Sequence, residues 1–427
     1  MRKIIASLLT LIIASNSHAQ LSDTEKKIIT YLKEHMNDAT AMLKESVNIN
    51  SGSLNIEGVK KTGALFATAL QKAGMQTEWV SLPDSLKRAG HLVATHKGKK
   101  GKKLFLIGHL DTVFEPDMPA NPWTLLNDST ATGQGANDMK GGDVVIIMAL
   151  QALNNMHLLD DATVVAYFTG DEESAGRPTN VSRKDFIERA KQCDIALGFE
   201  GAQGLHTVAT ARRGASGWKL AVTGTTFHSS GVFKNGYGAI YEAARILNEF
   251  REQLSNEQYL TFNPGLIAGG SDVVYNEEKA SAQTIGKTNI VSPACYVTGD
   301  LRFLTEAQKE NARAKMKAIV EKHLKNTNAK ITFSDGIPAM EPTEGNNKLV
   351  TVLDKITKDL GIGETKAGDP GNRGAGDISY IAKYVDCLDG LGASGNGAHA
   401  PGETINLKEF PYLIQRAAIL IYRLIKE

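Results

Sequence analysis

Residues 104–113 read LFLIGHLDTV, four apolar residues followed by a glycine, a histidine and an aspartate. The apolar run is too short for a helix and has no polar alternation, which is typical of a strand covered on both faces of a sheet. Similar runs occur at 164–168 (VVAYF) and, more weakly, at 195–197 (IAL), and residues 144–150 (VVIIMAL) read as a buried helix between the first two strands. This order predicts an α/β layer with a mostly parallel central sheet.

Upstream of this layer, residues 21–74 have the apolar spacing of helices. Downstream, Trp218, Leu220 and Val222 alternate with less apolar neighbours, which predicts a strand with one face in water. A helix with Ile240, Ala244, Leu247 and Phe250 on one stripe follows, then strands near 266–268 and 296–301, a helix over 305–324 and a strand at 331–333. This β-α-β-β-α-β order is ferredoxin-like. We therefore expect an inserted α+β domain at 214–325 within a first domain formed by 20–213 and 326–427.

The N-terminal residues 1–19 have the three parts of a secretory signal: Arg2 and Lys3, an apolar stretch, and Ser17-His18-Ala19. An uncleaved anchor would need about 20 apolar residues, so we expect export to the periplasm or the medium. Removal of the signal leaves 46 basic against 47 acidic residues. A nearly neutral chain argues against nucleic acid or a membrane as partner. The three widely spaced cysteines predict free buried thiols.

Histidines and carboxylates follow several of the predicted strands. His109 and Asp111 come after 104–107, Glu172 and Glu173 after 164–168, and Glu200 after 195–197, while His399 follows 384–388 through a glycine-rich loop. In an open α/β sheet the carboxyl ends of the strands form the binding edge. Each motif alone has an ordinary structural explanation, such as a hydrogen-bonded histidine or a solvated acidic turn. Their shared position, together with Asp138 in GANDMKGG, indicates one site.

Nitrogen and oxygen ligands without cysteine suit a catalytic rather than a structural zinc site. Two imidazoles and three carboxylates are one short of six ligand positions, so two metals would share one carboxylate. Paired metals about 3.5–4 Å apart would generate a hydroxide nucleophile and polarise a carbonyl group. Side chains of the adjacent Glu172 and Glu173 diverge, so one is expected to bind metal and the other to act as general base. Asp111 is placed to accept the second N–H of His109.

Two other functions are excluded by the motifs. Residues 133–142 (GQGANDMKGG) lack the GK[ST] ending of a phosphate-binding loop and contain an aspartate that would repel phosphate. The sequence also contains no Gly-x-Ser-x-Gly elbow of a serine hydrolase.

The motifs GHLDTV (108–113), DMKGG (138–142), DEES (171–174), GFEG (198–201) and the late His399 resemble, in order and spacing, those of the di-zinc exopeptidase and deacylase family. That family includes bacterial glutamate carboxypeptidase, aminoacylase and succinyl-diaminopimelate desuccinylase. The resemblance covers essentially the whole mature chain. It implies a zinc-exopeptidase-like catalytic domain with an inserted ferredoxin-like lid and dimerisation domain.

The resemblance also implies roles for the site residues. Two Zn²⁺ ions per subunit would be bridged by Asp138, with His109 and Glu200 completing one shell and Glu173 and His399 the other. Glu172 would be the general base and Asp111 would orient His109. The Asp138–Met139 peptide bond would be cis.

Substrate residues follow from the same resemblance. Glu200 stands where family aminopeptidases tend to carry Asp, which implies a carboxypeptidase or deacylase. The lid residue Arg302 would bind a substrate carboxylate, and Asn289, Gly374 and Gly376 occupy matching substrate positions. His228 matches a lid histidine that reaches the active site of a partner subunit, which implies a homodimer. Two departures, at Arg212-Arg213 and at Arg373, make this chain more basic than the family pattern.

These observations predict an exported zinc-dependent metallocarboxypeptidase, similar to glutamate carboxypeptidase, that hydrolyses the amide bond before a C-terminal amino acid. Its substrate would be a small peptide or an N-acyl amino acid. An N-acyl amino-acid deacylase using the same site is the alternative within enzymes. A non-catalytic binding protein is the alternative outside them, but such a protein has no need of Glu172.

Overall fold

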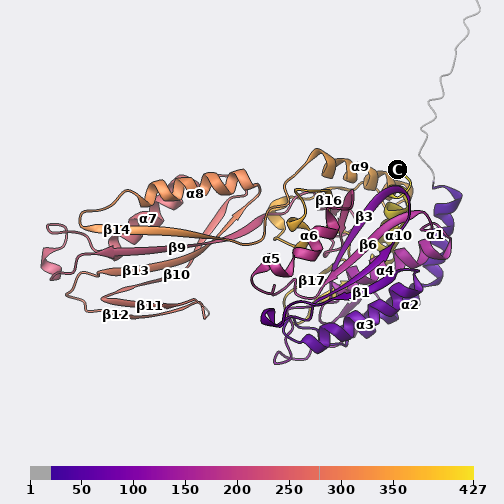
Figure 1. The fold of residues 1–427 in the computed structure, drawn as a ribbon, viewed down its shortest axis with the longest axis horizontal. Coiled ribbons are helices and arrows are strands. Elements are labelled where there is room, and N and C mark those ends of the chain that lie inside the picture. Colours follow the sequence, from indigo (N-terminus) through magenta and orange to yellow (C-terminus); the bar gives the residue numbers. More distant parts are fainter. Residues whose placement is uncertain (1–20, 278) are drawn as a thin grey trace, which may run out of the picture.

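The computed structural model describes residues 21–277 and 279–427, so the predicted signal at 1–19 lies outside the described residues. The centre of the structure is a six-stranded sheet (Figure 1). The strand order is β1 (Gln76–Val80), β2 (His91–His96), β6 (Ala162–Thr169), β3 (Lys100–His109), β7 (Ile195–Gly198), β16 (Asp386–Leu388). Strands β6, β3, β7 and β16 are parallel, whereas β1 and β2 are antiparallel to their neighbours. The predicted mostly parallel sheet is confirmed.

Both faces of this sheet are covered, as the unbroken apolar run at 104–107 predicted. Leu104 and Leu106 belong to a core that includes α4 (Lys140–Asn155) and α10 (Phe410–Leu424). Phe105 and Ile107 point to the opposite face, where they pack in a second core with α6 (Lys184–Ala190). Alternate residues of a strand point to opposite faces, so a strand buried on both must be apolar at every position.

Further helices and short strands complete this domain. The expected N-terminal helices are α1 (Asp23–Glu34), α2 (Met36–Val47) and α3 (Ile56–Lys72), and α9 (Glu344–Asp359) lies near β16 and α10. A small sheet has the order β17 (Gly395–Asn396), β18 (Thr404–Asn406), β5 (Thr130–Thr132), β4 (Thr124–Asn127), and β8 (Thr207–Val208) pairs with β15 (Lys366–Ala367). All three cysteines are free and buried, as predicted. Within the described residues, no helix combines the length and apolarity that a membrane crossing requires.

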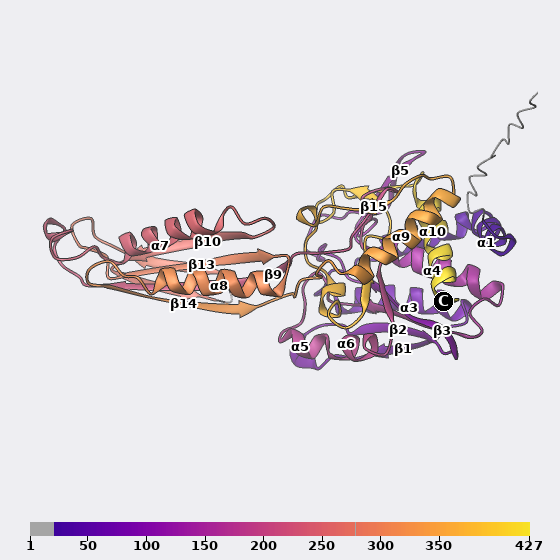
Figure 2. The ribbon, with the colours of Figure 1, turned by 90° about the horizontal axis from the view of Figure 1, so that it is seen from above.

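The inserted domain is an antiparallel sheet with two helices that projects from the catalytic domain (Figures 1 and 2). Its strand order is β10 (Thr261–Gly270), β13 (Ala294–Phe303), β9 (Gly214–Gly224), β14 (Thr327–Asp335), and α7 (Ala239–Leu254) and α8 (Glu306–Val320) pack in its core. In chain order the strands therefore lie 2-3-1-4, the ferredoxin-like arrangement predicted from the sequence. The buried face of β9 carries Trp218, Leu220 and Val222, which confirms its alternating pattern.

Three details of this inserted domain, which we call the lid, differ from expectation. The predicted stripe on α7 is confirmed at Phe250 and Leu247, which pack in the lid core, but not at Ile240 and Ala244, which are exposed. Ala243 and Ile246 face the core in their place. Strand β14 pairs with β9, so the lid sheet continues through 335 and the expected limit at 325 falls before its last strand. The hairpin β11 (Asp272–Asn276) and β12 (Ser281–Ile285) was not predicted.

Candidate metal centre and active site

The parallel strands bring the predicted site residues to one edge of the central sheet. His109 is the last residue of β3, Glu172 and Glu173 lie just beyond β6, and Glu200 lies just beyond β7. Because β6, β3 and β7 are parallel neighbours, their carboxyl ends meet at this edge. Asp138 lies two residues before α4, and His399 lies in the loop between β17 and β18.

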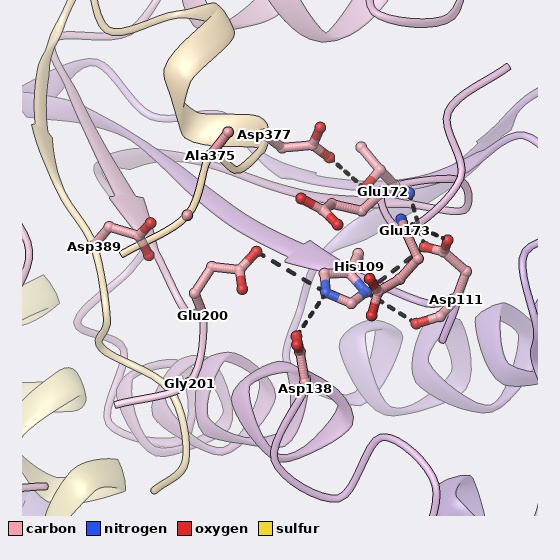
Figure 3. A network of polar contacts seen from close by, with 12 residues as sticks. His109, Asp111, Asp138, Glu172, Glu173, Glu200, Gly201, Ala375, Asp377 and Asp389 are labelled. Atoms are coloured by element: carbon pink, nitrogen blue, oxygen red, sulfur yellow. Dashed lines mark hydrogen bonds and ion pairs between the residues drawn. The ribbon is translucent and has the colours of Figure 1, made fainter. Parts of the chain in front are cut away.

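The five predicted ligands form two groups that share Asp138. In each group the potential ligand atoms lie within 4.8 Å of one another: His109, Asp138 and Glu200 in one, and Asp138, Glu173 and His399 in the other. Oδ1 of Asp138 lies 3.2 Å from Nε2 of His109, as Figure 3 shows, and its Oδ2 lies 3.0 Å from Nε2 of His399. The two oxygens of one carboxylate thus face two different imidazoles.

This arrangement fits two bound metal ions. Two atoms bound to the same tetrahedral zinc ion at about 2.0–2.2 Å are roughly 3.3–3.6 Å apart. The corresponding separations here are close to that value, since Nε2 of His109 lies 3.9 Å from Oε1 of Glu200 and Nε2 of His399 lies 3.1 Å from Oε2 of Glu173. The second oxygen of Glu173 is buried and has no hydrogen-bond partner among the described residues. Burial raises the pKa of Glu200 to about 7, as expected for an acidic cluster that requires cations.

The orientation of His109 is set by a different atom of Asp111 than we expected. Nδ1 of His109 lies 2.9 Å from the backbone oxygen of Asp111 and 3.6 Å from its carboxylate, so the carbonyl is the better acceptor. With Nδ1–H donating there, Nε2 is free to bind metal. The Asp111 carboxylate instead accepts the backbone N–H groups of Glu172 and Glu173 at 3.0 and 3.1 Å and the hydroxyl of Ser53 at 2.6 Å.

Glu172 is therefore held from its backbone, while its carboxylate lines the pocket beside Glu200. Burial and the charge of Glu200 raise the pKa of Glu172 well above its usual range. Bound cations would lower this pKa again, because they stabilise the ionised form. A carboxylate of this kind can accept a proton from water and return it.

Two buried groups that support Asp138 were not assigned from the sequence. The carboxylate of Glu403 accepts the backbone N–H groups of Asn137 at 2.6 Å and Asp138 at 2.8 Å. Nζ of Lys140 donates to the backbone oxygens of Ser46 and Ile49, which ties α2 to the start of α4. The peptide bond between Asp138 and Met139 is cis, as the resemblance implied. Glu403 belongs to the late GAHAPGE motif, and that position was its only signal in the sequence.

A second buried network lies behind Glu172. The guanidinium of Arg183, only 1% exposed, pairs with the carboxylates of Asp171 and Asp377, the latter at 2.7 Å. Thr169 donates to the second oxygen of Asp377 at 2.6 Å. Because Asp171 directly precedes Glu172, this network joins the acidic motif to the loop that precedes Asp377. No sequence periodicity marks these long-range pairs.

The active-site pocket, about 280 Å³, is lined by residues of the catalytic domain, including Asp138, Glu172, Glu200, Arg212, Arg373 and His399. Nε of Arg212 pairs with Asp389 at 2.6 Å, and its Nη1 donates to the backbone oxygen of Ala375 at 2.9 Å. Gly374 lines the pocket, whereas Gly376 leaves room for Arg212, since a Cβ there would lie 2.4 Å from Nη1.

The lid residues lie away from this pocket. Among the described residues that line it, none comes from the lid. Arg302 lies on β13 and pairs with Asp300 at 2.7 Å, its side chain 40% exposed. His228 and Asn289 are exposed in neighbouring lid segments, where His228 bridges to Ile290. This structure therefore does not bring Arg302, Asn289 or His228 together with the metal ligands.

A family model described as "Peptidase family M20/M25/M40" matches residues 105–423, which include every predicted metal ligand. The chain belongs to this family. As an M20 protein it is a metal-dependent peptidase or amidohydrolase, and the predicted family is confirmed. It is 27% identical to carboxypeptidase G2 of Pseudomonas sp. over 89% of this chain and 87% of that protein. It is 22% identical to succinyl-diaminopimelate desuccinylase of Psychromonas ingrahamii over 90% of this chain and 98% of that protein.

Solved structures of M20 proteins and other peptidases share the fold. Aminopeptidase PepT of Bacillus cereus superposes with a TM-score of 0.74 at 17% identity, covering 90% of this chain and 98% of that one. The metallo-carboxypeptidase Sso-CP2 of Sulfolobus solfataricus gives 0.64 at 19% identity, with coverages of 91% and 99%. The YXEP protein of Bacillus subtilis, described as a dinuclear metal binding peptidase, gives 0.64 at 14%, with coverages of 92% and 99%.

Proposed function

We propose that this M20 protein is an exported di-zinc metallocarboxypeptidase, similar to glutamate carboxypeptidase, that releases a C-terminal amino acid from a small peptide or an N-acyl amino acid. One observation carries the proposal. Two ligand groups share Asp138 at a pocket that is also lined by Glu172, a carboxylate that belongs to neither group. Glu200 and the similarity to carboxypeptidase G2 favour a carboxypeptidase over an aminopeptidase.

His109, Asp138 and Glu200 would hold one zinc ion, and Asp138, Glu173 and His399 the other. When bound, the ions supply Lewis-acid activation of the amide carbonyl and of water. Glu172 takes the proton of the attacking water and passes it to the nitrogen of the leaving amine as the C–N bond breaks. Asp111 keeps Glu172 in place through the two backbone N–H groups that its carboxylate accepts.

The lid would supply recognition of the C-terminal carboxylate. Arg302 is the group suited to this task, because a guanidinium binds a carboxylate through two parallel hydrogen bonds. In the present arrangement it pairs with Asp300 on the surface, so lid closure would exchange that partner for the substrate. Asn289 and Gly374 would contact the substrate on the lid and catalytic sides.

A hydrolysis panel tests the proposal. N-acyl amino acids and dipeptides, each with a free and an amidated C terminus, are incubated with the protein with and without zinc chelator. We expect cleavage of the free acids, little cleavage of the amides, and loss of activity after chelation that added Zn²⁺ restores. Preference for short acyl groups over dipeptides would favour the N-acyl amino-acid deacylase. Absence of cleavage across the whole panel would leave a non-catalytic binding protein and refute the proposal.

We also propose that the chain forms a homodimer through the lid and that His228 acts in the partner's active site on the oxyanion of the tetrahedral intermediate. The separation of His228 from the metal ligands within one chain is consistent with this role. His228→Ala and Glu172→Gln are each expected to be inactive alone. Mixing and refolding the two variants should restore activity, because one site of the mixed dimer then has both residues. No recovery, with dimers shown by sedimentation, would contradict the shared site.

Export through cleavage near Ala19 is the remaining part of the proposal. The basic start, the short apolar stretch and the small residues at 17–19 support it. Mass spectrometry of the protein recovered from the periplasmic or culture fraction should give an N terminus near residue 20, and an intact Met1 would contradict it.

A further inference from the structure

Among the residues that the structure describes, Arg373 is an arginine of the active-site pocket that has no ion-pair partner. Two arginines line the pocket, Arg212 and Arg373. Arg212 is neutralised by Asp389 at 2.6 Å. Within residues 21–277 and 279–427, by contrast, no carboxylate oxygen lies within 4.0 Å of a nitrogen of Arg373. Among the described residues, the guanidinium of Arg373 has a single protein acceptor, the backbone oxygen of Gly201, 2.8 Å from Nη1.

The guanidinium of Arg373 is also well placed for a ligand. A guanidinium group has five N–H donors, so most of those of Arg373 remain for a molecule in the pocket. Its position is built into the fold, because a Cβ at Gly390, where φ is +74°, would lie 2.3 Å from Nη2. Gly390 and Gly201 thus hold the group against the wall formed by the loops after β7 and β16.

The nearby acidic groups are already committed to other partners. Asp389 pairs with Arg212, and Asp138 and Glu200 belong to the metal groups. With two divalent cations bound, the charge of those carboxylates is more than balanced. A half-buried cation in such surroundings is stabilised by an anion that arrives with the substrate.

The position of Arg373 separates this anion from the C-terminal carboxylate. In the proposed function, on which this inference rests, the lid residue Arg302 binds the C-terminal carboxylate of the leaving amino acid. Arg373 belongs to the catalytic domain and lies beside Gly201, next to the candidate ligand Glu200. With the leaving amino acid held by the lid, the remaining half of the substrate, which carries the scissile carbonyl, would face this wall.

We propose that Arg373 is a specificity-determining residue that binds a carboxylate on the acyl half of the substrate, so that the preferred substrates are amides between an acidic acyl group and an amino acid. Neutral acyl groups of the same shape leave the guanidinium without its partner. Charge-assisted hydrogen bonds from a guanidinium to a carboxylate correspond to a preference of roughly 10- to 100-fold.

Isosteric substrate pairs test this proposal. The zinc-loaded protein is assayed with N-succinyl-L-alanine against N-succinamoyl-L-alanine, and with the glutaryl and glutaramoyl counterparts. We expect kcat/KM to be roughly 10- to 100-fold higher for the acidic member of at least one pair. Arg373→Gln should abolish the preference by lowering kcat/KM for the acidic substrate only. Arg373→Lys should retain part of the preference. Arg251→Gln, which removes an exposed cation from the lid helix α7, is the matched control and should leave the preference unchanged.

A binding measurement separates this inference from the proposed function. Calorimetry with succinate and with succinamate reports recognition without turnover, and the same loss of preference is expected in Arg373→Gln. Selective binding without hydrolysis would refute the proposed function and support the role of Arg373. Equal binding and equal hydrolysis of the acidic and neutral members by the wild-type protein would overturn the inference. So would an equal loss for both members in Arg373→Gln, which would assign Arg373 to support of the Gly201 loop alone.

Discussion

Glu172→Gln is expected to lower kcat by about 10²- to 10⁴-fold while both zinc ions remain bound. Glutamine has the shape of glutamate but cannot accept the proton of the attacking water. The metal content should persist, because Glu172 belongs to neither ligand group and the hydrogen bond from its backbone N–H to Asp111 is independent of its side chain. The measurements are kcat on the best substrate of the hydrolysis panel and zinc per chain by elemental analysis.

The adjacent residue provides the control for this experiment. Glu173→Gln is the same chemical change one position further along the chain, and Glu173 is in the group with Asp138 and His399. We expect this variant to lose one zinc ion per chain and to lose activity as a consequence. If Glu172→Gln also lost zinc, or if Glu173→Gln kept both ions, the division into base and ligand would be incorrect.

The convergence of these residues could be predicted because it depends on local patterns and one rule of topology. The runs at 104–107, 164–168 and 195–197 are apolar at each position, so they specify strands buried on both faces. Parallel pairing then places His109, Glu172 and Glu200 at one edge wherever the helices lie. The lid was predictable for the same reason, since the alternation around Trp218 and Leu220 fixes the face of β9 that meets the helices.

The contacts that could not be predicted depend on distant parts of the chain. Whether the carboxylate or the carbonyl of Asp111 meets His109 depends on Ser53 and on the N–H groups of Glu172 and Glu173, which compete for the carboxylate. The pairing of Glu403 with the Asp138 loop joins residues more than 260 positions apart. Such pairs leave no periodicity in the sequence, because each partner is an isolated polar residue.

The apolar stripe predicted on α7 shows a second reason why the sequence alone does not specify every packing face. Ile240 and Tyr241 are apolar or aromatic but exposed, so the apolar pattern of this helix has more than one candidate face. The buried face, with Ala243, Ile246 and Phe250, is selected by the lid sheet, which the helix sequence alone does not specify. Exposed apolar residues on a lid are compatible with the proposed dimer, and the refolded mixture of variants described above tests it.

The network behind Glu172 leads to the second large effect, which is on stability. Arg183→Met is expected to lower the free energy of unfolding by ~3–5 kcal/mol, because it leaves two buried carboxylates without their cation. Asp171 is fully buried and Asp377 is 3% exposed, so water cannot replace the guanidinium. Urea unfolding of the zinc-loaded protein, followed by circular dichroism, gives the difference. Arg189→Met is the matched control: Arg189 lies in the last turn of α6, the helix that begins directly after Arg183. It pairs with Glu78 and Asp185 and is 26% exposed. It should cost no more than about 1 kcal/mol.

The charge argument can be separated from simple loss of packing by removing the partners as well. In Arg183→Met combined with Asp171→Asn and Asp377→Asn, no buried charge remains unpaired, so stability should recover well above that of Arg183→Met alone. The triple variant also keeps the argument testable if Arg183→Met fails to fold. A triple variant no more stable than the single one would show that the hydrogen bonds of the guanidinium, not its charge, hold Asp171 and the loop before Asp377 together. The triple variant also tests an effect on catalysis, because Asp171 directly precedes Glu172. If the ion pairs of Arg183 help the Asp111 carboxylate to keep Glu172 in position, kcat should fall in the triple variant.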